Sequence, residues 1–293
     1  PLKIVTTIFP EYDWVREILG DKADHAEVTM LLDNGVDLHS YQPTADDIIK
    51  ISDCDLFIYV GGESDGWVED ALKEAANKDM QVINLLDVLG KQVKEEEVVE
   101  GMEAEEEESE DEDEPEYDEH VWLSLKNAET LCNAITDALE EIDPANKDAY
   151  AANAASYLEK LAALDGEYQT VVDNAARKTV LFGDRFPFRY LVDDYGLRYY
   201  AAFAGCSAET EASFETISFL AGKVDELGLP CVLTIEGAQH KIAETIVQNS
   251  AAKNQSILTL DSMQSTTSAD AANGTTYLSV MESNLDVLKQ ALN

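Results

Sequence analysis

The chain has 293 residues, of which 45% are hydrophobic, so it can bury one large core or two ordinary ones. Its formal net charge of -40 at pH 7 argues against nucleic acid and favours cations as partners, because phosphate binding depends on clustered Lys and Arg. No run approaches the roughly 18 consecutive apolar residues of a membrane span, and we expect none.

The first part of the chain alternates short β-branched runs with amphipathic segments. The run LKIVTTIF opens the sequence without a charged and apolar leader, so we expect a mature or trimmed domain. The alternation predicts βαβ units and a parallel sheet. The predicted strands cover residues 3–8, 26–31, 55–60 and 81–86.

An acidic tract follows these strands. Residues 95–119 hold 17 carboxylates and neither Lys nor Arg, a composition that cannot build a core. We therefore expect a disordered insert over about residues 95–118.

Two helices and a second set of strands complete the chain. A helix is predicted over 127–143, and the Ala-, Leu-, Glu- and Lys-rich segment that follows it predicts one long helix, over about 40 Å at 1.5 Å per residue. Four further β-branched runs, again separated by helical stretches, predict strands at residues 179–184, 197–203, 231–236 and 256–261.

The predicted fold class is therefore α/β, with two lobes that each hold a roughly four-stranded parallel sheet flanked by helices. We expect an N-terminal lobe over 1–143, a rigid linking helix over 144–177 and a C-terminal lobe over 178–293. Ligands of open parallel sheets bind beyond the carboxyl ends of the strands, so we expect the ligand in a cleft between the lobes.

Several polar residues fall at the predicted strand ends or beside them. His39 follows the second strand, His120 follows the acidic tract, and Asp184, Glu236 and Asp261 end the fifth, seventh and eighth strands. Imidazole with carboxylate suits Zn²⁺, whereas more oxygen ligands favour Mn²⁺. The alternative is that the histidines are surface or capping residues and the carboxylates cap the following helices. The two histidines form no local motif, so spacing alone leaves both interpretations open.

The cysteines show no CxxC pair and no metal-ligand spacing. We interpret them as small buried residues and leave a disulfide open. They are Cys54, Cys132, Cys206 and Cys231.

Five segments together resemble the zinc and manganese solute-binding proteins of bacterial ABC transporters, a family that includes zinc-uptake and adhesin-type lipoproteins. They are LKIVTTIFPEYDWVREILGD, GVDLHSYQPTADDI, EHVWLSLKNA, AANAASYLEKLAALDGEY and the closing LTLDSM…GTTYLSVMESNL. The resemblance spans nearly the whole chain in the same order. It implies a monomeric, non-enzymatic extracytoplasmic receptor that delivers a divalent metal to a membrane permease, and that is lipid-anchored or periplasmic.

The resemblance also implies site residues. His39 matches the first ligand in the family's G-x-D-x-H-x-Y-x-P segment, and His120 matches the second in H-x-W-L. Asp261 matches the carboxylate ligand of the C-terminal lobe. The family's surrounding structural positions are matched by Tyr41, Asp47 and Trp122.

The third ligand position departs from the family pattern, because Arg185 stands where the family usually has His or Glu. A guanidinium has no lone pair for a metal. The third ligand is Asp184, Glu236, His240 or a water molecule, or else the position has no ligand. We expect Arg185 to neutralise cleft carboxylates such as Glu209 or Glu211 rather than to bind an anion, and Glu236 either ligates the metal or pairs with Arg185.

The resemblance favours Zn²⁺, with Mn²⁺ as the alternative. The acidic tract lies where many zinc-binding relatives have a histidine-rich loop, and acts either as a weak cation collector or as a solvated insert. A metal-dependent hydrolase is the alternative from another class, but the sequence has no HExxH, GxSxG or P-loop pattern. Adhesion has no support beyond the resemblance.

Overall fold

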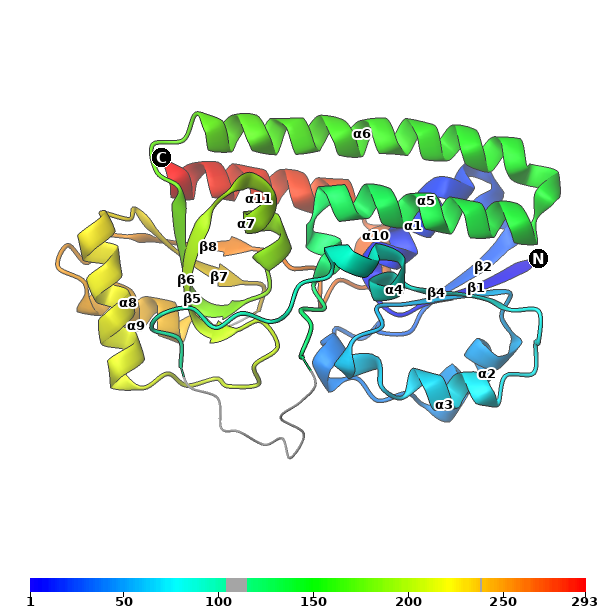
Figure 1. The fold of residues 1–293 in the computed structure, drawn as a ribbon, viewed down its shortest axis with the longest axis horizontal. Coiled ribbons are helices and arrows are strands. Elements are labelled where there is room, and N and C mark those ends of the chain that lie inside the picture. The colour runs from blue at the N-terminus through cyan, green and yellow to red at the C-terminus, as the bar shows by residue number, and fades with distance from the viewer. Residues whose placement is uncertain (104–114, 238) are drawn as a thin grey trace. The chain divides into compact units, whose positions relative to one another are not determined.

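The computed structural model describes residues 1–103, 115–237 and 239–293. Its contacts divide the chain into two compact units, each assembled from three separate segments (Figure 1). The first unit comprises Pro1–Val93, Ser124–Asp165 and Met263–Val280, and the second comprises Lys94–Leu123, Gly166–Ser262 and Met281–Asn293.

The first unit is built on a parallel sheet with the strand order β2-β1-β3-β4. The sheet consists of β1 (Leu2–Thr6), β2 (Ala26–Met30), β3 (Leu56–Tyr59) and β4 (Gln81–Asn84). The helices that lie wholly in this unit are α1 (Phe9–Leu19), α2 (Ala45–Asp53), α3 (Val68–Lys73), α4 (Leu85–Leu89), α5 (Leu125–Ile142) and α10 (Ser268–Ala272).

The last segment of the first unit is joined to helix α1 by buried contacts. The Trp14 ring meets the Tyr277 ring edge-on, with 5.2 Å between the centroids. The carboxylate of Asp13 accepts a hydrogen bond of 2.9 Å from the backbone N–H of Tyr277. Burial raises the pKa of Asp13 to about 6. This contact therefore places an ionisable group inside the core.

The second unit is built on a parallel sheet with the order β6-β5-β7-β8. The sheet consists of β5 (Thr179–Phe186), β6 (Arg198–Ala204), β7 (Cys231–Ile235) and β8 (Ser256–Leu260). Helices α8 (Phe214–Leu227) and α9 (Lys241–Asn249) contact each other and cover the sheet, while α7 (Arg189–Tyr195) follows β5. Leu181, Leu220 and Ile246 are among the buried residues of this core.

Two helices run through both units. Helix α6 (Lys147–Asp173) passes from the first to the second between Asp165 and Gly166, and α11 (Tyr277–Leu292) passes between Val280 and Met281. The eight strands and two parallel sheets found among the described residues, together with the long helix, confirm the predicted α/β class. The two units do not follow the expected division at residues 143 and 178. Each unit contains three segments that are far apart in the sequence, whereas the expected lobes were continuous. No helix among the described residues is both long and apolar enough to cross a bilayer.

The described flanks of the acidic tract have defined contacts, in contrast to the insert expected over about 95–118. Residues 94–103 and 115–123 belong to the second unit rather than to the N-terminal part. Glu95 and Tyr117 form an antiparallel bridge. Residues 104–114 lie outside the described residues, and the question of cation collection or solvation falls mainly on them.

Specific partners hold these flanks on the second unit. Arg189 forms an ion pair with Glu97 at 3.0 Å. The backbone N–H of Glu103 donates to the carbonyl of Ala202 at 2.8 Å, and the Glu103 carboxylate accepts from the backbone N–H of Ser213 at 2.9 Å. Carboxylates in this part of the tract therefore act as hydrogen-bond and ion-pair partners of the fold.

Candidate metal site

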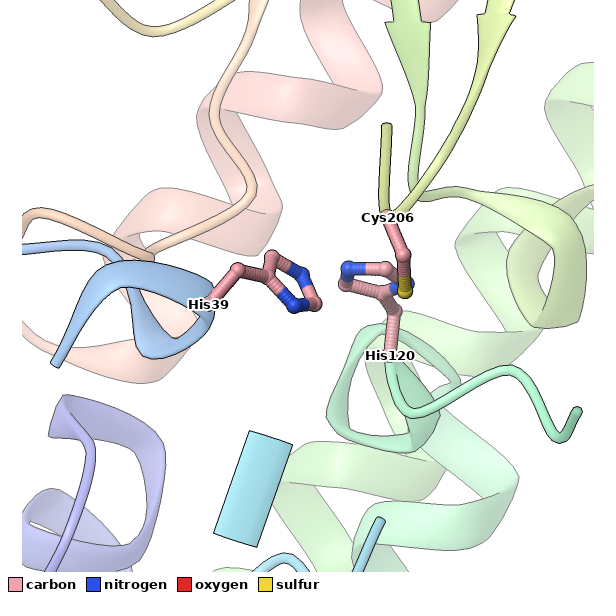
Figure 2. A group of neighbouring side chains, drawn as sticks. All are labelled: His39, His120 and Cys206. Carbon is pink, nitrogen blue, oxygen red and sulfur yellow. The ribbon is translucent and has the colours of Figure 1, made fainter. Parts of the chain in front are cut away.

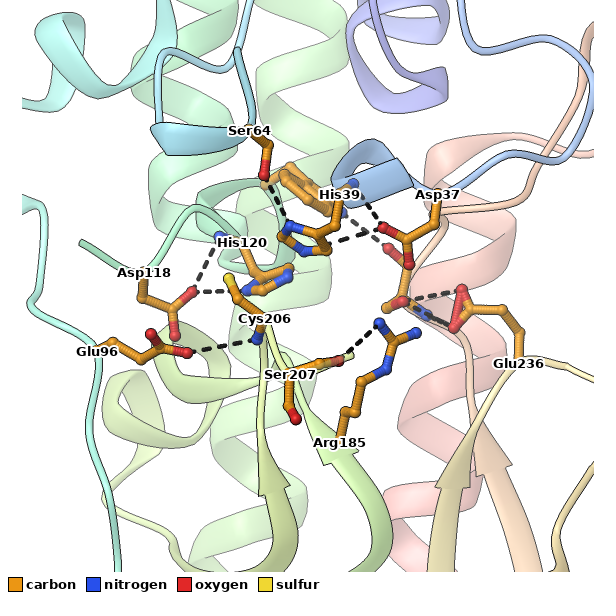
Figure 3. Close-up of polar contacts among 12 residues, drawn as sticks. Asp37, His39, Ser64, Glu96, Asp118, His120, Arg185, Cys206, Ser207 and Glu236 are labelled. Carbon is orange, nitrogen blue, oxygen red and sulfur yellow. Dashed lines mark hydrogen bonds and ion pairs between the residues drawn. The ribbon is translucent and has the colours of Figure 1, made fainter. Parts of the chain in front are cut away.

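In the first unit, His39 lies in a single 3₁₀ turn, η2 (Leu38–Ser40). The turn is capped by Asp37, whose carboxylate accepts from the backbone N–H of His39 at 2.8 Å. The His39 Nδ1 atom lies 2.7 Å from the hydroxyl of Ser64 (Figure 3). The side chain of His39 is only 15% exposed. The ring is therefore held in one orientation, and a metal would bind its Nε2 atom.

The residues after His39 support this turn. The hydroxyl of Tyr41 donates to the carboxylate of Asp47. Asp47 also forms a capping box with Thr44 at the start of α2. The Tyr41 ring meets the Trp67 ring edge-on at 5.8 Å. These contacts give Tyr41 and Asp47 a local positioning role.

In the second unit, His120 is fully buried. Its Nδ1 atom lies 2.8 Å from Asp118 Oδ1, which also accepts from the His120 backbone N–H at 3.0 Å (Figure 3). The His120 ring meets Trp122 edge-on at 5.5 Å, and the Trp122 indole N–H donates to the carbonyl of Ser262 at 2.9 Å. A carboxylate on Nδ1 fixes the tautomer with Nε2 as acceptor, the arrangement that orients metal-binding histidines.

Cys206 lies beside His120, and we did not predict a ligand role for it from its sequence context. The sulfur of Cys206 and a ring nitrogen of His120 lie within 4.8 Å of each other (Figure 2). Cys206 follows β6 directly after Gly205, and its backbone N–H donates to the carboxylate of Glu96 at 3.4 Å. Burial, together with neighbouring carboxylates of which Glu96 is foremost, raises the pKa of the Cys206 thiol.

Gly205 permits the close approach of this loop to His120. A Cβ atom at this position would lie 2.7 Å from the Phe186 carbonyl oxygen and 3.0 Å from Cε1 of His120. Separations under 3.0 Å are essentially never found for a real Cβ atom, so a side chain here would displace its neighbours. The glycine is therefore part of the site's construction.

Two of the predicted carboxylates connect neighbouring strands. The Asp184 carboxylate accepts from the backbone N–H of Ile235 at 3.1 Å and of Arg185 at 2.8 Å, and burial raises its pKa. The Glu236 carboxylate accepts from the backbone N–H of Ser262 at 2.9 Å and from its hydroxyl at 2.7 Å. Both carboxylates position the ends of strands.

Asp261 and His240 lie at other points of the second unit. The backbone of Asp261 is held by the Asn284 side chain through two hydrogen bonds of 2.9 Å. His240 is the N-cap of α9, and its buried Nδ1 has no hydrogen-bond partner among the described residues. Neither residue joins His120 and Cys206 in a ligand group within the described parts of the chain, and neither does Asp184 or Glu236.

The four cysteines are free thiols, so the structure contains no disulfide among them. Cys54, Cys132 and Cys231 are buried, as expected. Cys206 is the partly exposed one.

Two parallel sheets, with one oriented imidazole in each unit, fit the class of solute-binding proteins for metals. The chain belongs to the family described as zinc-uptake complex component A, periplasmic, whose model matches residues 4–291. It is 33% identical to the zinc-binding lipoprotein AdcA of Streptococcus pneumoniae over 290 residues, which are 99% of this chain and 55% of that protein. It is also 33% identical to the high-affinity zinc uptake system protein ZnuA of Bacillus subtilis, covering 99% of this chain and 88% of that protein.

Solved structures show the same fold. The Zn(II)-bound ZnuA-like domain of Streptococcus pneumoniae AdcA matches with a TM-score of 0.76 and 30% identity, over 99% of this chain and 98% of that domain. The metal-dependent lipoprotein YcdH of Bacillus subtilis matches with a TM-score of 0.79 and 28% identity, over 100% and 99% of the two chains. The chain thus corresponds to the ZnuA-like part of AdcA and spans about half of that protein's length.

Proposed function

We propose that this chain is an extracytoplasmic solute-binding protein that captures Zn²⁺ and delivers it to an ABC transporter permease. Family membership over residues 4–291 supports this, as do the zinc-binding and zinc-uptake names of its relatives. The AdcA relative is named a lipoprotein and the family description is periplasmic, which supports a location outside the cytoplasm, lipid-anchored or periplasmic.

The observation that carries the proposal is the setting of His120. A fully buried imidazole with a carboxylate 2.8 Å from Nδ1 is the arrangement that metal sites use to present Nε2. His39 offers a second oriented imidazole through its contact with Ser64. The net charge of -40 adds a general attraction for cations.

The proposed ligands are His39 and His120, with Asp261 retained from the family resemblance. Imidazole ligands suit Zn²⁺, and Mn²⁺ remains the alternative because it prefers oxygen ligands. We assign Glu236 and Asp184 to strand positioning, because backbone N–H groups use their carboxylates.

Titration of the metal-free protein with Zn²⁺ and with Mn²⁺ tests binding. We expect wild type to bind Zn²⁺ more tightly than Mn²⁺, and His39→Ala and His120→Ala each to weaken Zn²⁺ binding by about 100-fold or more, since even the loss of an orienting contact costs about 10–100-fold. His25→Ala is the matched control, because His25 is exposed in a 3₁₀ segment of the first unit. Unchanged Zn²⁺ affinity in both variants would contradict the proposal.

Delivery needs a separate measurement. Cells that carry His120→Ala in place of the wild-type gene should accumulate less zinc from zinc-poor medium, while cells with His25→Ala should match wild type. Equal zinc uptake in all three strains would contradict a role in transport.

A further inference from the structure

We propose that Cys206 is a metal ligand and forms with His120 a thiolate–imidazole pair for a soft or borderline divalent cation. This inference rests on the proposed function, metal capture, and adds a ligand to it. The pair lies within the second unit, and its ligand atoms lie within 4.8 Å of each other (Figure 2). Two donors bound to one tetrahedral zinc ion at about 2.0–2.3 Å lie about 3.5 Å apart, which is within this limit.

The fold brings these two residues together from distant parts of the sequence. Cys206 lies two residues beyond the end of β6. His120 directly follows residues 115–119 of the acidic tract, which belong to the same unit. Gly205 lets the Cys206 loop meet the His120 ring, because any Cβ at that position would lie 3.0 Å from Cε1. The contact therefore depends on the residue that immediately precedes the cysteine.

The Cys206 loop is held on both sides of the sulfur. Glu96 accepts from the Cys206 backbone N–H at 3.4 Å. Nη1 of Arg185 lies 3.5 Å from the carbonyl oxygen of Ser207, which is a long hydrogen bond (Figure 3). Arg185 cannot ligate a metal, but from this position it supports the backbone of Ser207, the residue that follows Cys206.

Binding requires the thiol to lose its proton. The S–H bond breaks, the proton passes to solvent, and the sulfur lone pair forms the bond to the metal, so no oxidant or reductant is involved. Asp118 and Glu119, both buried beside His120, are negative charges that attract a cation. Their charge compensates for that of the incoming ion.

A sulfur ligand makes selection between metals a property of this residue. Thiolate favours Zn²⁺ over Mn²⁺, which prefers carboxylate, carbonyl and water oxygens. The second unit therefore contributes a discriminating ligand in addition to an imidazole.

Cobalt(II) reports directly on sulfur ligation. We expect the wild-type protein loaded with Co²⁺ to show a near-ultraviolet thiolate-to-metal charge-transfer band, and Cys206→Ser to lack it. Cys231→Ser is the control, since Cys231 is a buried thiol in β7 of the same unit, and it should retain the band. Absence of the band in wild type, or its persistence in Cys206→Ser, would overturn the assignment.

Competition titrations test selectivity. We expect Cys206→Ser to lose at least about tenfold in Zn²⁺ affinity and little in Mn²⁺ affinity. The ratio of Zn²⁺ affinity to Mn²⁺ affinity should therefore fall. An unchanged ratio refutes the inference. Cys206→Ala, and unfolding midpoints of both variants, separate loss of a ligand from loss of the fold. If wild type binds no Zn²⁺, the proposed function fails, while the Co²⁺ band still decides the role of Cys206.

Discussion

Gly205→Ala tests whether the close contact between the Cys206 loop and His120 contributes to the free energy of unfolding and to Zn²⁺ affinity. The new Cβ would lie 2.7 Å from the Phe186 carbonyl oxygen and 3.0 Å from Cε1 of His120, whereas ordinary contact begins at 3.4 Å. The carbonyl must therefore retreat by about 0.7 Å and the ring by about 0.4 Å, distances that a close-packed interior resists.

We expect Gly205→Ala to lower the free energy of unfolding by about 1–3 kcal/mol, the usual cost of overpacking. Because the displaced ring belongs to His120, we also expect a loss of about tenfold in Zn²⁺ affinity, equivalent to about 1.4 kcal/mol. Urea unfolding monitored by circular dichroism measures the first quantity, and calorimetric titration measures the second.

Gly222→Ala is the matched control. Gly222 lies in α8 of the same unit, and a Cβ there meets nothing within 4 Å. Alanine inside a helix should raise the free energy of unfolding by about 0.5–1 kcal/mol and leave metal affinity unchanged. If Gly205→Ala behaves like Gly222→Ala in both assays, the argument from close approach is refuted.

Two further predictions concern buried carboxylates. Asp118→Asn should weaken Zn²⁺ binding by about 10–100-fold, because an amide fixes the His120 tautomer less firmly. Asp225→Asn, on α8 and remote from His120, should leave Zn²⁺ binding unchanged. Equal Zn²⁺ titration curves for wild type and Asp118→Asn would count against the orienting role. For Asp13, the pKa of about 6 in the folded protein exceeds the value of 3.8 in the unfolded chain. Its contribution to the free energy of unfolding is therefore full below about pH 4 and is lost as the pH rises to about 6. The loss is on the order of 3 kcal/mol. Asp13→Asn should remove that part of the pH dependence in urea unfolding measured from pH 4 to 7; parallel wild-type and variant curves would contradict it.

The sequence predicted the fold well because each strand is a short β-branched run between amphipathic segments. Strands buried in parallel sheets need continuous apolar runs, and this requirement is visible at KIVTTI as it is at CVLTIE. The unit boundaries were not visible, because residues 94–103 are assigned by contacts such as Glu97 with Arg189, which join positions 92 residues apart. Local composition carries no information on such pairs.

Cys206 is a residue that the sequence analysis gave no site role, although the structure places its sulfur near a ring nitrogen of His120. The absence of CxxC spacing led us to interpret all four cysteines as buried packing residues, although ligands drawn from different elements need no local spacing. The rule that singled out Asp184, Glu236 and Asp261 was position at the carboxyl end of a strand. Applied to β6, the same rule leads to Cys206.

The assembly of both units from three separate segments constrains how the protein reaches its native state. Residues 263–280 complete the first unit and residues 281–293 the second, and they supply the partners of Asp13 (Tyr277) and of Asp261 (Asn284). Until residues 263–293 have been synthesised, neither unit has its full set of contacts, so neither can finish folding. Completion of both units is therefore expected to wait for this one segment of the chain.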